Sequence, residues 1–252
     1  MLPAIADTPL YNPLPMPRRP AIRFTGILSA VLCACSALIG TAHAGDPWEF
    51  WPELNGFVSL SPRTRIYLDV AYAQGNESDA QALDLAAYLD ISFKPIVQKS
   101  LRTLDWQRSR FLWARIGYDH IFKTSEGTSS PGEDRGILSI YAKAGLPAEI
   151  WLEGRVRADL RWIDGEYSTR YRFRLEATRE FTVRDGAIVP YFNVEWFYDT
   201  RYDGLARILY QAGYEFTVNQ HFRFEVYLAR QRDLLPSASS LNAFGVVSKW
   251  YY

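Results

Sequence analysis

Cysteine is nearly absent from this chain of 252 residues. Its only two cysteines, Cys33 and Cys35, lie in an uncharged apolar run from Gly26 to Gly40. A chain that loses this run has no thiol, so it forms no disulfide and no thiolate metal site. Such a chain also passes an oxidising compartment without mispairing.

The apolar run has the flanks of a secretory signal. Three arginines precede it, and Thr41-Ala42-His43-Ala44 follows it with the small residues of a cleavage site. The run is shorter than the roughly 20 residues that a membrane-spanning helix needs. We therefore expect residues 1–44 to be a signal peptide cleaved after the last residue of that quartet, with translation starting at the first residue or at Met16. Residues 45–252 are expected to form one domain.

Excess charge and ligand-binding motifs are scarce as well. The 28 basic residues equal the 28 acidic ones, and the chain has only three histidines. It contains no glycine-rich phosphate loop, no His/Cys metal spacing and no nucleic-acid-binding module. The sequence therefore argues against nucleic acid as a partner, and it predicts no cofactor and no metal site.

Helical periodicity is also lacking from Trp51 onward, where apolar and polar residues alternate in steps of two. Eleven stretches alternate in this way: 53–60, 65–72, 83–93, 111–122, 136–145, 150–162, 166–177, 188–198, 207–216, 222–228 and 241–252. Bacterial single-chain membrane barrels have an even number of strands. We therefore expect about twelve strands, with one more in residues 95–107, or else ten. Residues 123–134 are expected to be an exposed loop.

Two of these stretches meet at Asp164-Gly165, a dipeptide typical of two-residue hairpin turns. The turn sets a register in which Trp162 faces Tyr167 and Val156 faces Phe173. Both strands alternate for about a dozen residues, whereas soluble strands usually have about 5 to 6 and tilted membrane-spanning strands need about 9 to 11. We therefore predict an all-β protein, a transmembrane antiparallel up-and-down β-barrel of a Gram-negative outer membrane.

Aromatic residues, 15% of the chain, cluster near the ends of the apolar faces. Tyr and Trp favour membrane interfaces, where one end of the side chain is apolar and the other is hydrated. The predicted girdle residues are Trp162, Tyr167, Trp196, Tyr198, Trp250 and Tyr252. The last strand also ends on an aromatic residue, which resembles the signal read by the outer-membrane barrel assembly machinery. Membrane lipid and this machinery are therefore the expected partners.

Three motifs resemble the bacterial domain of unknown function 2490 family. They are Glu49-Phe50-Trp51-Pro52-Glu53-Leu54, Trp162-Ile163-Asp164-Gly165-Glu166-Tyr167 and Glu195-Trp196-Phe197-Tyr198-Asp199. The resemblance covers nearly all of the expected mature chain. It implies an outer-membrane protein, and it supplies no catalytic or binding residues.

The polar face of the central hairpin is strongly charged. It contains Glu153, Arg155, Arg157, Asp159, Arg161, Glu166, Arg170, Arg172, Arg174 and Glu176. An arginine that faces lipid at mid-membrane costs about 2 to 4 kcal/mol, so we expect these residues to line the lumen. They predict either a narrow arginine-lined channel for small anionic solutes or a self-neutralising network, with Glu195, Glu215 and Glu225, that fills the barrel.

An enzyme is the second class of function considered. An outer-membrane lipid hydrolase needs a histidine beside a serine nucleophile, and only His120 and His221 lie outside the expected leader. His120 shares the apolar face with Tyr118 but has no serine two residues along, and His221 follows a turn. The sequence therefore predicts no catalytic residues, with lipid hydrolysis retained as an alternative.

Overall fold

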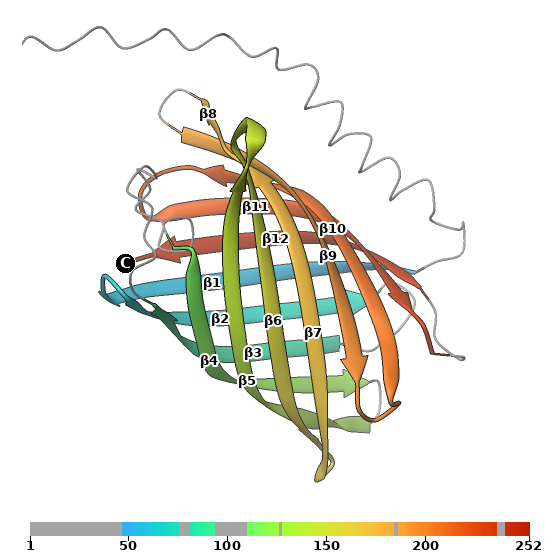
Figure 1. Cartoon of the computed structure of the whole chain (residues 1–252). Helices are drawn as coiled ribbons and strands as arrows, with labels where there is room; N and C mark the ends of the chain where they lie inside the picture. Colours follow the sequence, from blue (N-terminus) through green and yellow to red (C-terminus); the bar gives the residue numbers. More distant parts are fainter. Residues whose placement is uncertain (1–46, 76–80, 94–109, 126–127, 184–185, 236–239) are drawn as a thin grey trace, which may run out of the picture.

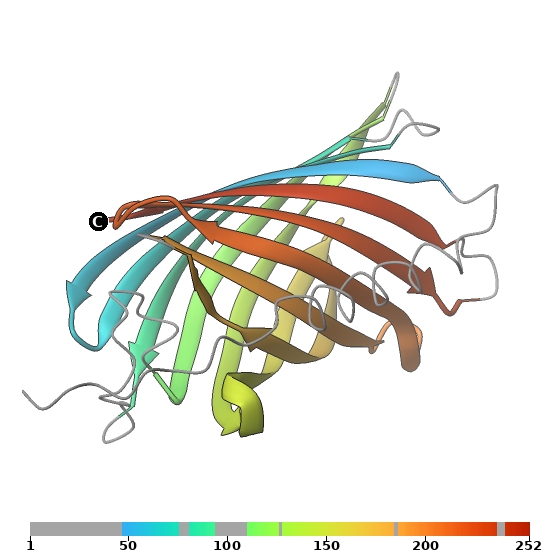
Figure 2. The same ribbon diagram turned by 90° about the horizontal axis from the view of Figure 1, so that it is seen from above.

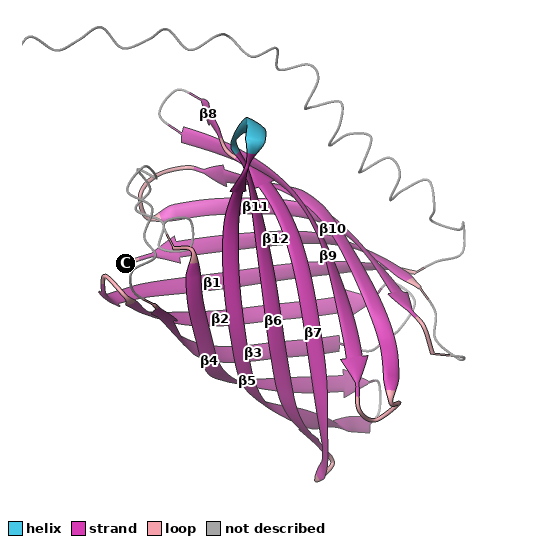
Figure 3. Cartoon of the chain, viewed as in Figure 1, coloured by secondary structure: helices cyan, strands magenta, loops and turns pink. Residues whose placement is uncertain are grey.

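The computed structural model describes residues 47–75, 81–93, 110–125, 128–183, 186–235 and 240–252. The expected signal peptide, both cysteines and the additional strand expected in residues 95–107 lie outside these ranges. Among the described residues, no helix is long and apolar enough to cross a membrane. The regular elements there are strands, apart from one short 3-10 turn, η1 (Pro147–Glu149) (Figure 3).

Twelve strands follow one another along the described chain. They are β1 (Trp48–Ser61), β2 (Thr64–Gly75), β3 (Gln81–Ser92), β4 (Leu112–Ser125), β5 (Thr128–Leu146), β6 (Ile150–Ile163), β7 (Glu166–Arg179), β8 (Phe181–Val183), β9 (Gly186–Asp199), β10 (Gly204–Thr217), β11 (Phe222–Asp233) and β12 (Leu241–Tyr251).

Eleven of the strands close into a barrel (Figures 1 and 2). Successive wall strands pair antiparallel, with β7 paired directly to β9. β1 then pairs with β12 in parallel, from Trp48 opposite Asn242 to Phe57 opposite Tyr251, and this β1–β12 seam closes the ring. The short β8 lies outside the ring and pairs with the start of β9.

The predicted all-β barrel is confirmed, and twelve strands are present, but only eleven of them build the wall. These eleven correspond to the eleven alternating stretches of the sequence, and β8 is the twelfth strand. An odd number of strands cannot close with antiparallel pairs throughout, because the first and last strands then run in the same direction. The even count usual for bacterial barrels was therefore the wrong guide, and the parallel β1–β12 seam is the geometric result.

The β6–β7 hairpin has the predicted register. Val156 lies opposite Phe173, and Trp162 lies opposite Tyr167. Asp164 and Gly165 both have positive φ, at 56° and 81°, as the favoured two-residue hairpin turn requires. The turn chemistry and the alternation therefore agree along the whole hairpin.

The expected loop at residues 123–134 was wrong. β4 continues to Ser125 and β5 begins at Thr128, so the two strands extend as a hairpin. A register shift between Ile121 and Lys123 interrupts the ladder there. Such a bulge breaks strict alternation, which explains why the sequence pattern fades while the backbone pairing persists.

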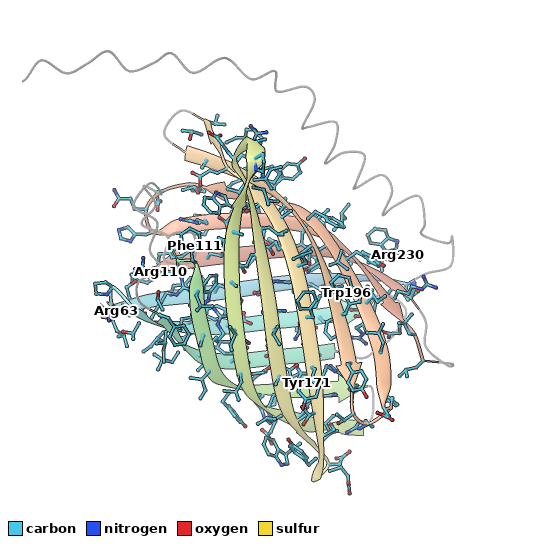
Figure 4. The ribbon with its side chains drawn as sticks, viewed as in Figure 1. Arg63, Arg110, Phe111, Tyr171, Trp196 and Arg230 are labelled. Atoms are coloured by element: carbon cyan, nitrogen blue, oxygen red, sulfur yellow. The ribbon has the colours of Figure 1, made fainter. Side chains whose placement is uncertain are left out.

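The two faces of the wall have opposite character. On the outer face, Val156 is 57% exposed and Phe173 is 46% exposed. Figure 4 shows Tyr171 and Trp196 on the same outer side. The charged residues that alternate with them, such as Arg155 and Arg157, are buried inside the ring. The barrel is therefore apolar outside and charged inside, the reverse of a soluble sandwich.

Candidate functional site: the barrel interior

A polar cavity of about 380 Å³ lies inside the barrel, and all eleven wall strands contribute to its lining. Eight of the lining residues are basic, nine are acidic and five are tyrosines. The lining is therefore close to neutral as a whole. A locally positive stretch of wall must be balanced by acidic residues elsewhere around the ring.

The charged residues predicted on the β6–β7 hairpin fall into three places. Six of them line the cavity: Glu153, Arg155, Arg157, Arg172, Arg174 and Glu176. Asp159, Arg161 and Arg170 form ion pairs beside the cavity, toward the hairpin turn. Glu166 is exposed next to that turn, where it borders a separate surface pocket with Asp164 and Arg201, and it does not line the cavity.

The opposed arginines of this hairpin obtain their countercharge from two acidic residues. Arg157 faces Arg172 across the hairpin, in the same register that places Val156 opposite Phe173. Glu195 of β9 accepts hydrogen bonds from Arg155 Nη2 at 2.5 Å and from Arg172 Nε at 2.6 Å. Asp159 pairs with Arg157, and its Oδ2 lies 3.7 Å from Arg172 Nη1. Close opposite charges in a medium less polar than water offset the repulsion between the arginines, so this part of the wall is neutralised locally.

A second network runs along the inner side of the wall near the β6–β7 turn. Glu133 of β5 is fully buried and accepts hydrogen bonds from Arg161 and, at 2.7 Å, from Arg135 Nε. Asp199 of β9, also fully buried, pairs with Arg161 Nη1 at 2.6 Å and with Arg170 Nη2 at 2.9 Å. Four wall strands are thus joined by ion pairs at this end of the lumen.

The opposite end of the lumen contains a compact arginine–aspartate–arginine group. Asp90 of β3 is fully buried and accepts hydrogen bonds from Arg65 Nη2 and Arg115 Nε, each at 2.6 Å. The guanidinium of Arg65 lies 4.4 Å from the ring centroid of Phe57, and that of Arg115 lies 4.2 Å from the centroid of Tyr67. Cation–π contacts of this kind strengthen when they are desolvated.

These guanidinium groups rest on a ladder of stacked aromatic rings. Tyr251, Phe57 and Tyr67 stack with 4.7 Å between successive ring centroids, and Tyr88 follows at 5.1 Å. The ladder crosses the β1–β12 seam and continues over β2 and β3. The last strand is therefore tied to the first three by side chains as well as by the backbone.

Sequence reasoning did not predict the roles of Asp90, Glu133 or Asp199. Each of them is in phase with the inward face of its strand, so a signal was present. Apart from Arg135, which is two residues from Glu133, their arginine partners lie 25 to 38 residues away, as for Asp90 with Arg65 and Asp199 with Arg161. Such partners can be assigned only when the order and stagger of the strands are known.

This fold is accompanied by a family match. The family model described as a protein of unknown function, DUF2490, matches residues 48–242, from the first wall strand to the start of the last. The chain belongs to the DUF2490 family. A search of curated proteins finds no match.

Most of the aromatic residues predicted as girdles are exposed on the outside of this DUF2490 barrel. The exposed ones are Trp162, Tyr167, Tyr198, Trp250 and Tyr252. The first three lie near the end where β6 turns into β7, and the last two lie at the opposite end, where β12 finishes. Trp196 is half-buried and stacks on Phe173, with 5.6 Å between the ring centroids.

One histidine of the DUF2490 chain forms a carboxylate-oriented pair on the outer face. Nδ1 of His120 lies 2.6 Å from Oδ1 of Asp134, and Tyr118 donates a hydrogen bond to the same oxygen. The imidazole packs edge-on against Phe122, with 4.2 Å between ring centroids. The sequence placed this histidine correctly on the apolar face but did not predict its carboxylate partner.

Breaking the Asp90 group tests whether buried ion pairs hold the DUF2490 barrel together. Asp90→Asn leaves two buried guanidinium groups without their shared carboxylate, so we expect the free energy of unfolding to fall by about 3 to 5 kcal/mol. The measurement is a urea titration followed by tryptophan fluorescence, in one detergent for all variants.

The matched control for this prediction is Asp233→Asn. Asp233 pairs with Arg207, whose side chain is about one-third exposed, so its loss costs at most about 1 kcal/mol. Equal destabilisation by the two variants would contradict the special role of the buried group.

Proposed function

We propose that this chain is an outer-membrane β-barrel that spans the bilayer and encloses a small polar chamber, not an open pore. The observation that carries the proposal is the reversed character of the wall, with apolar side chains outside and paired charges inside. Among the described residues, thirty-two large apolar or aromatic side chains are exposed. Monomeric soluble proteins rarely expose contiguous apolar surface beyond a few hundred Å². Contact with the hydrocarbon core of a membrane therefore explains this surface best.

The dimensions of the wall support the same proposal. Its strands have 11 to 19 residues, and a tilted strand needs about 9 to 11 residues to cross a bilayer. The exposed aromatic residues near both ends of the barrel suit the two interfaces. The aromatic end of β12 suits recognition by the barrel assembly machinery, and the expected signal peptide suits export.

A chamber accounts for the interior better than an anion channel does. Glu195 and Asp159 neutralise Arg155, Arg157 and Arg172 of the β6–β7 hairpin. The buried network of Glu133 and Asp199 lies on the inner side of the wall at one end of the lumen, and the buried group around Asp90 lies toward the other. An anion that passed would have to displace these paired carboxylates, and breaking a buried pair is costly.

A charge placed on the outer face tests the membrane location. We expect Val156→Arg to lower the free energy of unfolding in lipid bilayers by about 2 to 4 kcal/mol, because the new guanidinium would face hydrocarbon. Tyr202→Arg, in the β9–β10 turn, should change it by no more than about 0.5 kcal/mol. Equal, negligible effects for both variants would place the outer face in water and overturn the proposal.

Electrical recording tests the chamber against the pore. The folded protein, inserted in a planar bilayer at neutral pH, should show no discrete conductance steps, because buried ion pairs lie inside its lumen toward both ends. Anion-biased steps that shift when Arg172 is replaced by Gln would instead establish the arginine-lined channel.

The His120–Asp134 pair favours a second candidate, hydrolysis of lipid esters. A carboxylate on Nδ1 orients the imidazole, and no described side chain hydrogen-bonds to Nε2. In this candidate Nε2 takes a proton from a water molecule that attacks the acyl carbonyl, and then returns it to the departing alcohol. No described serine or threonine hydroxyl contacts the imidazole, so water is the nucleophile.

A fatty-acid release assay on phospholipid–detergent micelles tests this candidate. His120→Ala should lower the rate by about 10²- to 10⁴-fold, the usual contribution of a general base. His221→Ala is the matched control, because Nδ1 of His221 contacts only the backbone carbonyl of Tyr251. An inactive wild-type protein, or an active His120→Ala variant, would remove the candidate.

A further inference from the structure

Every basic residue that lines the cavity has a carboxylate partner, but some carboxylates that line it have no basic partner among the described residues. Each of the eight basic groups has a carboxylate oxygen within 3.5 Å. Neither Glu53 nor Asp69 forms an ion pair with any described residue, and Asp84 approaches Arg135 only at 4.0 Å. The unbalanced charge of the cavity is therefore negative, and it lies on β1, β2 and β3.

These carboxyl groups form a row around the wall. Register places Glu53 diagonal to Asp69, Asp69 diagonal to Asp84, and Asp84 diagonal to Asp119 on β4. The carboxyl groups of Glu53 and Asp69 lie within hydrogen-bonding distance of each other, as do those of Asp84 and Asp119. Oδ1 of Asp69, of Asp84 and of Asp119 is buried and receives no N–H or O–H donor from a described residue.

Three tyrosines give a second and independent observation. Tyr88, Tyr141 and Tyr227 are each more than nine-tenths buried and line the same cavity. Their hydroxyl groups make no hydrogen bond to any described residue. Buried polar groups in native proteins are normally hydrogen-bonded, so hydroxyls left unpartnered at a cavity wall indicate a polar occupant.

We propose that the chamber binds a small organic cation with at least two N–H-bearing groups, such as a diamine, against Glu53 and Asp69. Glu53 accepts a hydrogen bond from Asn55 Nδ2 at 2.7 Å but has no described basic partner, and Oδ1 of Asp69 has no donor from a described residue. Ionised carboxylates only accept hydrogen bonds, so an ammonium or guanidinium group supplies the donor that Asp69 lacks and the positive charge that both groups lack. The tyrosine hydroxyls accept further N–H bonds. A volume of about 380 Å³ falls within the range of small-molecule sites.

Two other occupants fit the cavity less well. Within the described part of the chain, no three His, Cys, Asp or Glu side chains converge closely enough to hold a metal ion. An anion would meet the unpaired carboxylates, while every arginine is already engaged. The cation has the opposite sign to the solute predicted from the β6–β7 hairpin alone, because that hairpin is only one part of the ring.

Binding should be coupled to proton release. Two carboxyl groups that share a site cannot both ionise easily, so in the unliganded chamber a neighbouring pair retains a proton. A bound ammonium replaces that proton as the hydrogen-bond donor. The proton leaves to solvent when the diamine enters, and the two ammonium groups then balance the two ionised carboxylates.

The test is titration calorimetry of the folded protein in detergent with 1,4-diaminobutane, with glutarate as an anion of similar length. The diamine should bind saturably, and the heats in phosphate and in Tris should differ because protons are released. Glutarate should give no saturable heat. Asp69→Asn and Glu53→Gln should each weaken diamine binding about 10- to 100-fold, because each removes a charge-assisted hydrogen bond.

Asp233→Asn is the control, because Asp233 does not line the cavity, and it should leave the affinity unchanged. The proposal fails if the wild-type protein does not bind the diamine, if both cavity variants bind it as the wild type does, or if glutarate competes. It rests on the closed chamber proposed above and not on the membrane location. If the protein binds the diamine but Val156→Arg leaves its stability in bilayers unchanged, the diamine site stands and only the proposed membrane location is contradicted.

Discussion

The structure depends on one constraint: charged side chains enclosed by a closed wall must find partners within the wall. Burying a single charge costs several kcal/mol unless it is paired and hydrogen-bonded. The interior therefore contains shared carboxylates, each serving two arginines, as Asp90, Glu195 and Asp199 do. Each of these carboxylates ties together three strands of the wall.

This constraint links the fold to the interior chemistry. Antiparallel register sets arginines opposite each other on the β6–β7 hairpin. Glu195 reaches these arginines because β9 pairs with β7. Stability and the electrostatics of the chamber are then properties of the same contacts. A substitution that opens the lumen must therefore also weaken the wall, which distinguishes this barrel from a wide porin whose water-filled interior tolerates unpaired charge.

The sequence predicted the wall well because alternation and turn chemistry are local signals. Every wall strand appeared as an alternating stretch, and the Asp164-Gly165 turn predicted the hairpin register residue by residue. β8 was missed because three residues are too few to show a period. Twelve strands are present, as predicted, but the even-number rule concerns closure of the wall, which no local pattern reports, so the sequence did not show that only eleven of them form the ring.

The interior was predicted only in part, for a similar reason. Arg155 and Arg157 were expected to line the lumen and both lie at the cavity wall, but the sign of the cavity depends on residues from β1 to β4 that no hairpin argument connects to them. In the sequence, Glu53 and Asp69 have the phase of any inward-facing carboxylate. Only the closed ring shows that no described basic residue pairs with them. The exposed position of Glu166 shows the same limit, because phase predicts a face but not whether the strand is still inside the barrel.

The parallel β1–β12 seam separates the start of β1 from the end of β12 by the height of the wall. The ten residue pairs along this seam span about 30 Å at the usual rise per strand residue. An ordinary barrel with an even number of strands can be circularly permuted by joining its ends with a short loop. Here the joining segment would have to traverse the whole barrel, outside or through it, so any rearranged gene for this fold needs a long linker.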